Sequence, residues 1–173
     1  MNSKLQHLFD VLEYDRTSLI TTLKNLSPEK LQQSPEGKWS VHQILSHLIT
    51  AEKLSVMYLH KKILGINEAG DTGLWEEFKI LLLQVSQRLP LKFKAPQNVV
   101  DNTPSHLNFN EITTDWEKTR TELKALLEKL DDTQIKRKIY KHFFAGRLNI
   151  QHALIFLREH IIHHQAQINR LLK

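Results

Sequence analysis

The end of the chain, LNIQHALIFLREHIIHHQAQINRLLK at residues 148–173, has the pattern of one long amphipathic helix. At about 100° per residue, its apolar side chains form one stripe made of Ala153, Leu154, Leu157, Ile161, Ile168, Leu171 and Leu172. A helix with such a stripe buries it against neighbouring elements and leaves its polar face in water. The segment therefore predicts a helical protein whose last helix lines the core.

Four further segments have helical periodicity, at about residues 4–26, 40–64, 72–89 and 110–130. The second begins with a capping box, because the Ser40 hydroxyl can accept from the amide of Gln43 while the Gln43 side chain reaches back. We expect Asn110 to cap the fourth. Only five Gly and five Pro occur in the 173 residues, which is few for a sheet protein with many turns. The sequence predicts an all-α bundle of four or five helices.

Two segments lack this periodicity. Residues 90–109 contain three prolines and predict a long loop, which in a compact domain is usually functional or mobile. The segment 131–147 contains Gly146, which we expect at a turn. The length suits one compact domain over residues 1–173.

The composition excludes several classes of protein. There is no cysteine, so the chain has no disulfide framework, no thiolate nucleophile and no cysteine-based metal site. Any metal ion must be held by His, Asp or Glu. No apolar run approaches the roughly 18 residues of a membrane span, and no signal-peptide pattern opens the chain. We therefore expect a cytoplasmic protein that does not enter the membrane.

Positive charge is concentrated in the last third of the chain. Residues 118–173 carry twelve Lys and Arg against five Asp and Glu, within a net charge of +5. The only basic run, residues 136–138, has no interleaved aromatic residues of the kind that stack on bases. Nucleic acid is therefore not an expected partner, whereas an anionic small molecule suits this charge.

Three histidines lie where helical geometry can bring them together. His160 and His164 are four residues apart, within or at the edge of the apolar stripe of the last helix, so their side chains stack on one face. His47 borders the apolar face of the second helix. Other directions are expected for His42 and His60 of the second helix and for His163 of the last helix. Three neutral imidazoles with an open fourth position are typical of a catalytic metal site.

The alternative is that these histidines are ordinary hydrogen-bonded residues at the edge of the core. Ten histidines in the chain make chance pairs four residues apart common. Two other metal motifs are absent, because Ile161 replaces the glutamate of H-E-x-x-H and no glutamate has a histidine three residues later. Surface or loop positions are expected for His7, His106 and His152.

Five pieces of sequence, taken in order, resemble the DinB-like (DinB/YfiT) superfamily of metalloenzymes. The resemblance extends from Trp39 to the C-terminus and rests on WSVHQILSHL at 39–48, KFKAP at 92–96, DWEKTR at 115–120, HFFAGRLN at 142–149 and HIIHHQAQI at 160–168. It implies an up-down-down-up four-helix bundle with a short extra helix or long loop. It also implies three metal ligands, carried onto His47, His160 and His164, and a homodimer. Phe143 departs from the family, many of whose members have proline there.

The family includes S-transferases that use bacillithiol, mycothiol or glutathione, and metal-dependent hydrolases. The resemblance thus implies an enzyme with a divalent metal, zinc or nickel, that activates a small-molecule thiol or water to attack an electrophilic substrate. His142, His163 and Gln167 are candidates for contacts to the ligands or the substrate, with helix packing as the other interpretation. No residue is assigned as a general base. The competing hypothesis is a non-catalytic, stress-related bundle in which the histidines or the metal are structural.

Overall fold

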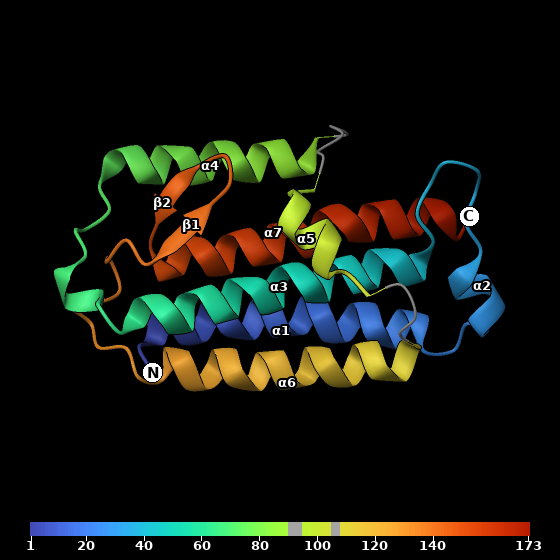
Figure 1. Ribbon diagram of the computed structural model, residues 1–173, viewed down its shortest axis with the longest axis horizontal. Helices are drawn as coiled ribbons and strands as arrows, with labels where there is room; N and C mark the ends of the chain where they lie inside the picture. The colour runs from blue at the N-terminus through green and yellow to red at the C-terminus, as the bar shows by residue number, and fades with distance from the viewer. Residues whose placement is uncertain (90–94, 105–107) are drawn as a thin grey trace.

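A computed structural model describes residues 1–89, 95–104 and 108–173 (Figure 1). Helices make up most of these residues, as predicted. The elements in chain order are α1 (Ser3–Leu23), α2 (Pro28–Gln32), α3 (Val41–Ile63), the 3-10 turn η1 (Ile66–Glu68), α4 (Leu74–Arg88), α5 (Gln97–Asn102), α6 (Phe109–Leu127), β1 (Tyr140–His142), β2 (Gly146–Leu148) and α7 (Ile150–Leu171).

Four long helices form the bundle. In Figure 1, α1 and α7 run in one direction and α3 and α6 run in the other, so the topology is up-down-down-up. Helix α7 packs against α1 and α3, and α6 packs against α3. The extra helix α4 packs on the outer side of α7. The predicted fold class and topology are therefore correct, and α4 is the extra helix.

Side-chain caps fix where the main helices begin. The amide of Gln43 donates to the Ser40 hydroxyl at 3.2 Å and the Ser40 amide donates to Gln43 at 2.9 Å, which completes the predicted capping box of α3. The prediction that Asn110 caps the fourth helix is wrong, because Asn108 makes the corresponding pair of bonds with Glu111. Only Asn108 has a glutamate three residues later and so completes a capping box, whereas the residue three after Asn110 is Thr113.

Two short helices were not predicted. Helix α2 begins at Pro28 after the Ser27 cap, and α5 lies inside the segment that we expected to be a continuous loop. Helices of five or six residues are too short to show a hydrophobic period. The other parts of that predicted loop, residues 90–94 and 105–107, lie outside the described residues, and His106 and most of KFKAP lie with them.

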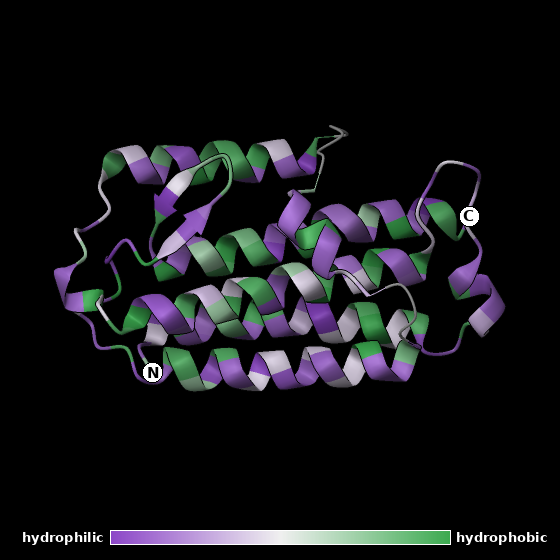
Figure 2. Ribbon diagram, viewed as in Figure 1, coloured by the Kyte–Doolittle hydropathy of each residue, from purple (hydrophilic) through white to green (hydrophobic). Residues whose placement is uncertain are grey.

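The core between the four long helices is mostly apolar and contains a buried ionic group. Figure 2 shows hydrophobic residues distributed along the bundle helices. Within this interior, Arg120 of α6 pairs with Glu52 of α3, and the indole of Trp116 donates to the same carboxylate at 2.8 Å. All three side chains are buried. The DWEKTR segment therefore ties α6 to α3.

None of the described helices has the length and apolar character that crossing a bilayer requires.

A two-stranded antiparallel hairpin precedes α7. Strands β1 and β2 pair Tyr140 with Leu148 and His142 with Gly146. Gly146 has a φ of 74°, a conformation that glycine adopts without strain, so the predicted turn residue is at the end of the hairpin turn. The side chain of Asn149 donates to Thr72 at 2.7 Å. The hairpin is thereby tied to the segment just before α4.

Candidate metal centre

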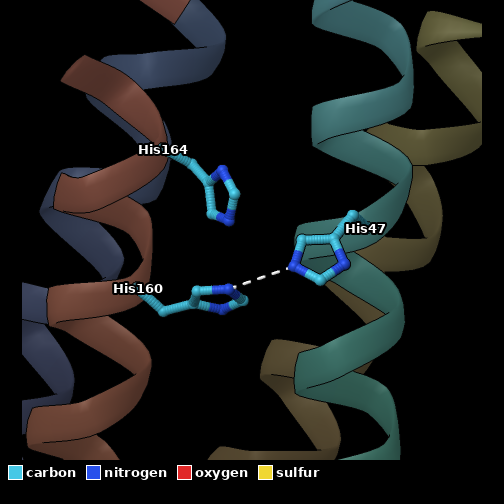
Figure 3. A group of neighbouring side chains, drawn as sticks. All are labelled: His47, His160 and His164. Atoms are coloured by element: carbon cyan, nitrogen blue, oxygen red, sulfur yellow. Dashed lines mark hydrogen bonds between the residues drawn. The ribbon is translucent and has the colours of Figure 1, made fainter. Parts of the chain in front are cut away.

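The three predicted histidines meet between α3 and α7. Figure 3 shows their rings pointing into one space, His47 from α3 and the other two from successive turns of α7. One ring nitrogen of each lies within 4.8 Å of the others. The ring centroid of His47 lies 5.1 Å from that of His160 and 5.0 Å from that of His164. The predicted convergence is present, and the role of these residues as metal ligands stays a prediction.

Neighbouring side chains hold each ring in place. The ring of His47 lies 5.1 Å from that of Trp39, and His160 stacks on Phe156 with an angle of 13° between the planes. Nδ1 of His164 lies 2.9 Å from Oε1 of Gln167. Because an amide oxygen only accepts, Nδ1 carries the proton of His164 and Nε2 keeps its lone pair. That tautomer leaves Nε2 free to bind a cation.

Burial keeps the cluster uncharged at neutral pH. Loss of hydration lowers the pKa of His47 to about 4. Loss of hydration, together with the nearby ring of His47, lowers the pKa of His164 to about 3. The pKa of His160 is also well below its ordinary value, first through burial and then through the other rings of the cluster. Neutral imidazole is the form that binds metal ions.

The histidines lie in the wall of a cavity of about 730 Å³. Its lining continues along α3 to Ser55, along α7 to Phe156, and across to Tyr140 of the hairpin. Residues 95–100, including the start of α5, border it on another side. Cavities of about 300–1,000 Å³ suit small-molecule ligands. A small molecule can thus lie directly beside the three imidazoles.

His142 also lines this cavity, and the hairpin fixes its orientation. Its Nδ1 accepts from the amides of Phe144 at 3.3 Å and Ala145 at 3.2 Å. Nδ1 is therefore the acceptor, and the proton of the neutral ring lies on Nε2. Burial lowers the pKa of His142 to about 4. Phe143, which stands where many family members have proline, lies exposed in the turn after His142.

The sequence of this chain matches that of a known protein family. The sequence profile of the DinB superfamily matches residues 12–168. The chain belongs to the DinB superfamily. Among solved structures, it is similar to YfiT from Bacillus subtilis, with a TM-score of 0.62 and 17% identity over 99% of this chain and 87% of YfiT. YfiT is described as "a probable metal-dependent hydrolase with an unusual four-helix bundle topology". No curated protein matches the chain.

Within this DinB fold, the other candidate residues make packing contacts. Nδ1 of His163 lies 2.7 Å from the backbone oxygen of Gln87, which ties α7 to α4. Gln167 orients His164, as described above. The surface or loop position predicted for His152 is wrong. It lies in the first turn of α7, only 2% exposed, with Nε2 3.0 Å from Glu77. Since α4 covers this turn, a histidine that looks peripheral in sequence becomes buried.

Sequence reasoning did not identify one polar pair in the cavity. The hydroxyls of Ser55 and Tyr140 lie 3.2 Å apart, and burial raises the pKa of Tyr140 to about 12. Ser55 lies on the same face of α3 as His47, which the helical period indicates. Tyr140 had no such signal, because a strand of three residues is too short for its alternation to be recognised.

Proposed function

We propose that His47, His160 and His164 bind one divalent cation, and that this ion activates a nucleophile for attack on an electrophile held in the cavity. The observation that carries the proposal is the meeting of three neutral imidazoles in the wall of a cavity large enough for a substrate. Three protein ligands leave a coordination position open, as in catalytic zinc sites. Imidazole suits zinc and nickel equally, so either ion fits.

The bound ion supplies positive charge that lowers the pKa of a coordinated water, to about 7 in known zinc enzymes, and likewise favours a thiolate. The residues that line the cavity supply the environment around the ion and the substrate. Phe156 and the apolar part of the lining limit the access of water. The proton on Nε2 of His142 is available to a polar group of the substrate. Ser55 and Tyr140 offer a second hydrogen-bonding point in the lining.

A small-molecule thiol of the bacillithiol type is the nucleophile that we favour. The chain has no cysteine of its own, and Lys141 in the cavity lining is a cation that suits the carboxylates of such a thiol. In the reaction, the sulfur of the intact thiol would form a bond to an electrophilic carbon of the acceptor and displace a leaving group from it, and the thiol proton would pass to solvent. Water is the second candidate, supported by the description of YfiT as a probable hydrolase. A single domain over residues 1–173, a cytoplasmic location and the lack of a nucleic-acid partner stay predictions.

Metal content tests the first part of the proposal. The wild type and His160→Ala would be incubated with zinc or nickel, freed of loose metal and analysed for bound metal. We expect about one ion per chain in the wild type and a loss of at least tenfold in affinity in the variant. His60→Ala is the matched control, because His60 is an exposed histidine of α3. Equal metal in all three proteins would refute the site.

Turnover tests the second part. The metal-loaded protein would be mixed with bacillithiol, glutathione or another low-molecular-weight thiol and an electrophilic acceptor, and thiol loss would be followed. Metal-dependent loss above the uncatalysed rate supports the transferase. Ester hydrolysis without thiol supports the hydrolase. Bound metal with neither activity would favour a structural metal in a non-catalytic bundle.

A further inference from the structure

The cavity continues beyond the three histidines into a part that is lined by rings. Ser55 also lines it, and the eight residues of α3 from His47 to Ser55 span about 12 Å. Phe156 lies one turn before His160 on α7 and stacks on it. The hairpin contacts both helices. We call this part of the cavity the aromatic chamber and define it by six lining residues, Leu54, Ser55, Tyr140, His142, Phe144 and Phe156.

The rings of the aromatic chamber are arranged so that a further ring can pack among them. Those of His142 and Phe156 meet edge to face with centroids 4.4 Å apart, and those of Tyr140 and Phe156 lie 6.2 Å apart. The ring of Phe144 lies 6.1 Å from that of His142. Tilted rings attract one another beyond the effect of buried area, because the edge of a ring is positive and its face is negative. An aromatic ligand gains this attraction, whereas an aliphatic ligand gains only from burial.

The charges of the cavity restrict the ligand further. Neither Asp nor Glu is present among the described residues of the lining, and Lys141 is the one Lys or Arg among them. A cationic ligand would have no carboxylate to pair with, and a metal ion at the histidines would repel it. Lys141 is exposed, so it does not offset the cost of burying an anion in the chamber. The aromatic chamber therefore suits an uncharged ligand.

The hydrogen bonds of the chamber leave His142 with an unused donor. The hydroxyl of Ser55 donates to the backbone oxygen of Ala51 at 2.8 Å, so Tyr140 is the donor in its 3.2 Å pair with Ser55. Both hydroxyl protons are thus used. Nε2–H of His142 has no acceptor among the described residues, although the residue is only 7% exposed. This nitrogen is not one of the enclosed unpaired atoms, so it faces the open cavity.

We propose that the electrophile of this site is an uncharged aromatic molecule whose ring lies in the aromatic chamber and whose nitro or carbonyl oxygen accepts a hydrogen bond from Nε2–H of His142. This inference rests on the proposed function, because it names the class of acceptor that the thiol attacks. The ring contacts select an aromatic body, the charges select an uncharged one, and His142 selects the acceptor group.

The same hydrogen bond acts during the reaction. With 1-chloro-2,4-dinitrobenzene, the thiol sulfur forms a bond to the ring carbon that carries chlorine. The carbon–chlorine bond breaks, chloride leaves with the bonding pair, and the thiol proton passes to solvent. Negative charge spreads onto the nitro oxygens during the attack. A fixed donor beside such an oxygen stabilises this charge more than the uncharged ground state, so His142 serves turnover as well as binding.

Binding of unreactive aromatic molecules to the metal-free protein is the first test. Amide ¹H–¹⁵N spectra would be recorded during titration with meta-dinitrobenzene, which has the ring and the nitro groups but no leaving group. We expect saturable shifts in the hairpin turn and around Phe156. The cation meta-nitrobenzylammonium should bind at least about tenfold more weakly, because its charge would be buried without a partner. Equal affinity for the cation, or no saturable shifts at these positions, would overturn the proposal.

A change at His142 tests the hydrogen bond. His142→Leu removes the donor, so meta-dinitrobenzene should bind about three- to tenfold more weakly, as expected for one hydrogen bond. Its affinity for meta-xylene, which has no acceptor, should not change. His142→Gln keeps a donor and should recover most of the loss. His60→Leu is the matched control, because His60 is an exposed histidine of α3 outside the cavity lining.

Circular dichroism would confirm that the variants are folded. A folded His142→Leu that binds both ligands as the wild type does, or that loses both equally, would refute the role of His142. A further measurement needs no variant. In the wild type, the Nε2–H signal of His142 should shift with meta-dinitrobenzene and not with meta-xylene, and an unchanged signal at saturation would equally refute this role.

The two proposals fail separately, because these binding tests use no metal ion. A protein that binds the uncharged nitroaromatic but no metal would refute the metal centre and retain the specificity of the chamber. A protein that binds metal and consumes a thiol with iodoacetamide, but neither binds meta-dinitrobenzene nor uses 1-chloro-2,4-dinitrobenzene, would refute only the present inference.

Discussion

His142 shows how a short turn can set the chemistry of one side chain. Two backbone amides of the hairpin donate to its Nδ1, so the proton of the neutral ring is held on Nε2, in a residue that lines the cavity. His164 is fixed in the opposite tautomer through Gln167. Two neutral histidines of one cavity are thus prepared for different tasks, one to donate a hydrogen bond and the other to offer a lone pair.

The tautomer of His142 can be measured directly. In long-range ¹H–¹⁵N spectra of the metal-free protein, we expect the His142 ring to have a protonated Nε2 and an unprotonated Nδ1. The ring should stay neutral down to about pH 4, because burial lowers its pKa. His142→Gln would assign the signal. A proton on Nδ1, or titration near the ordinary value of about 6.5, would contradict the hydrogen bonds described above.

The positions of the site residues were predictable where they depend only on the periodicity of one helix or of two facing helices. The four-residue step from His160 to His164 and the position of His47 on the face of α3 required only the helical period. The orientation of His142 and its hydrogen bonds to Phe144 and Ala145 depend on a tight turn that no period encodes. The burial of His152 depends on where α4 packs. Sequence thus predicts contacts along regular helices better than contacts made by turns and by packing between elements.

Helices α3 and α6 are joined by a buried charge pair as well as by apolar packing. Arg120 and Glu52 lie in the interior, and Trp116 shares the same carboxylate. A second carboxylate, that of Glu13 in α1, lies 3.7 Å from the Arg120 guanidinium. Three helices therefore meet at one charged group, which helps to fix how they pack.

Removing one partner of this pair should be costly. We expect Arg120→Ala to lower the free energy of unfolding by about 3–5 kcal/mol, because it leaves the Glu52 carboxylate buried without its cation. Asp71→Ala, which breaks the more exposed pair with Arg137, should cost less than about 1 kcal/mol. Urea denaturation measures both values. Similar losses in the two variants would mean that the interior pair has no special role in stability.

At the level of the whole molecule, the bundle brings together residues from its N-terminal and C-terminal halves. The proposed metal centre needs α3 and α7 side by side, and the cavity also needs the hairpin and the start of α5. The fold class and the up-down-down-up order were predictable from helical periodicity and family motifs. The outer position of α4 was not, because its apolar residues on the solvent side look in sequence like a second buried face.

The buried histidines should make the stability of the metal-free protein depend on pH. His47, His142 and His164 have a pKa of about 3 to 4 in the folded state, below the value of about 6.5 expected after unfolding. The unfolded chain therefore takes up more protons as pH falls below 6.5, and stability is lost toward the folded pKa values.

Urea titrations of the metal-free protein at pH 7, 6 and 5 measure this loss. Each such histidine makes the free energy of unfolding fall with decreasing pH by an amount that approaches about 1.4 kcal/mol per pH unit. His142→Gln should show a shallower slope than the wild type, because one of these groups is missing. Identical slopes for the two proteins, or stability that rises as the solution is acidified, would contradict the burial of neutral histidines.

In the proposed site, the imidazoles of His47, His160 and His164 bind one divalent cation. An anomalous difference map from a zinc-soaked or nickel-soaked crystal, recorded at the absorption edge of that metal, tests it most directly. We predict one strong peak between α3 and α7, with about 2.0–2.1 Å from zinc to one nitrogen of each ring. A map with no peak there, or with the metal bound only by other residues, would contradict the claim.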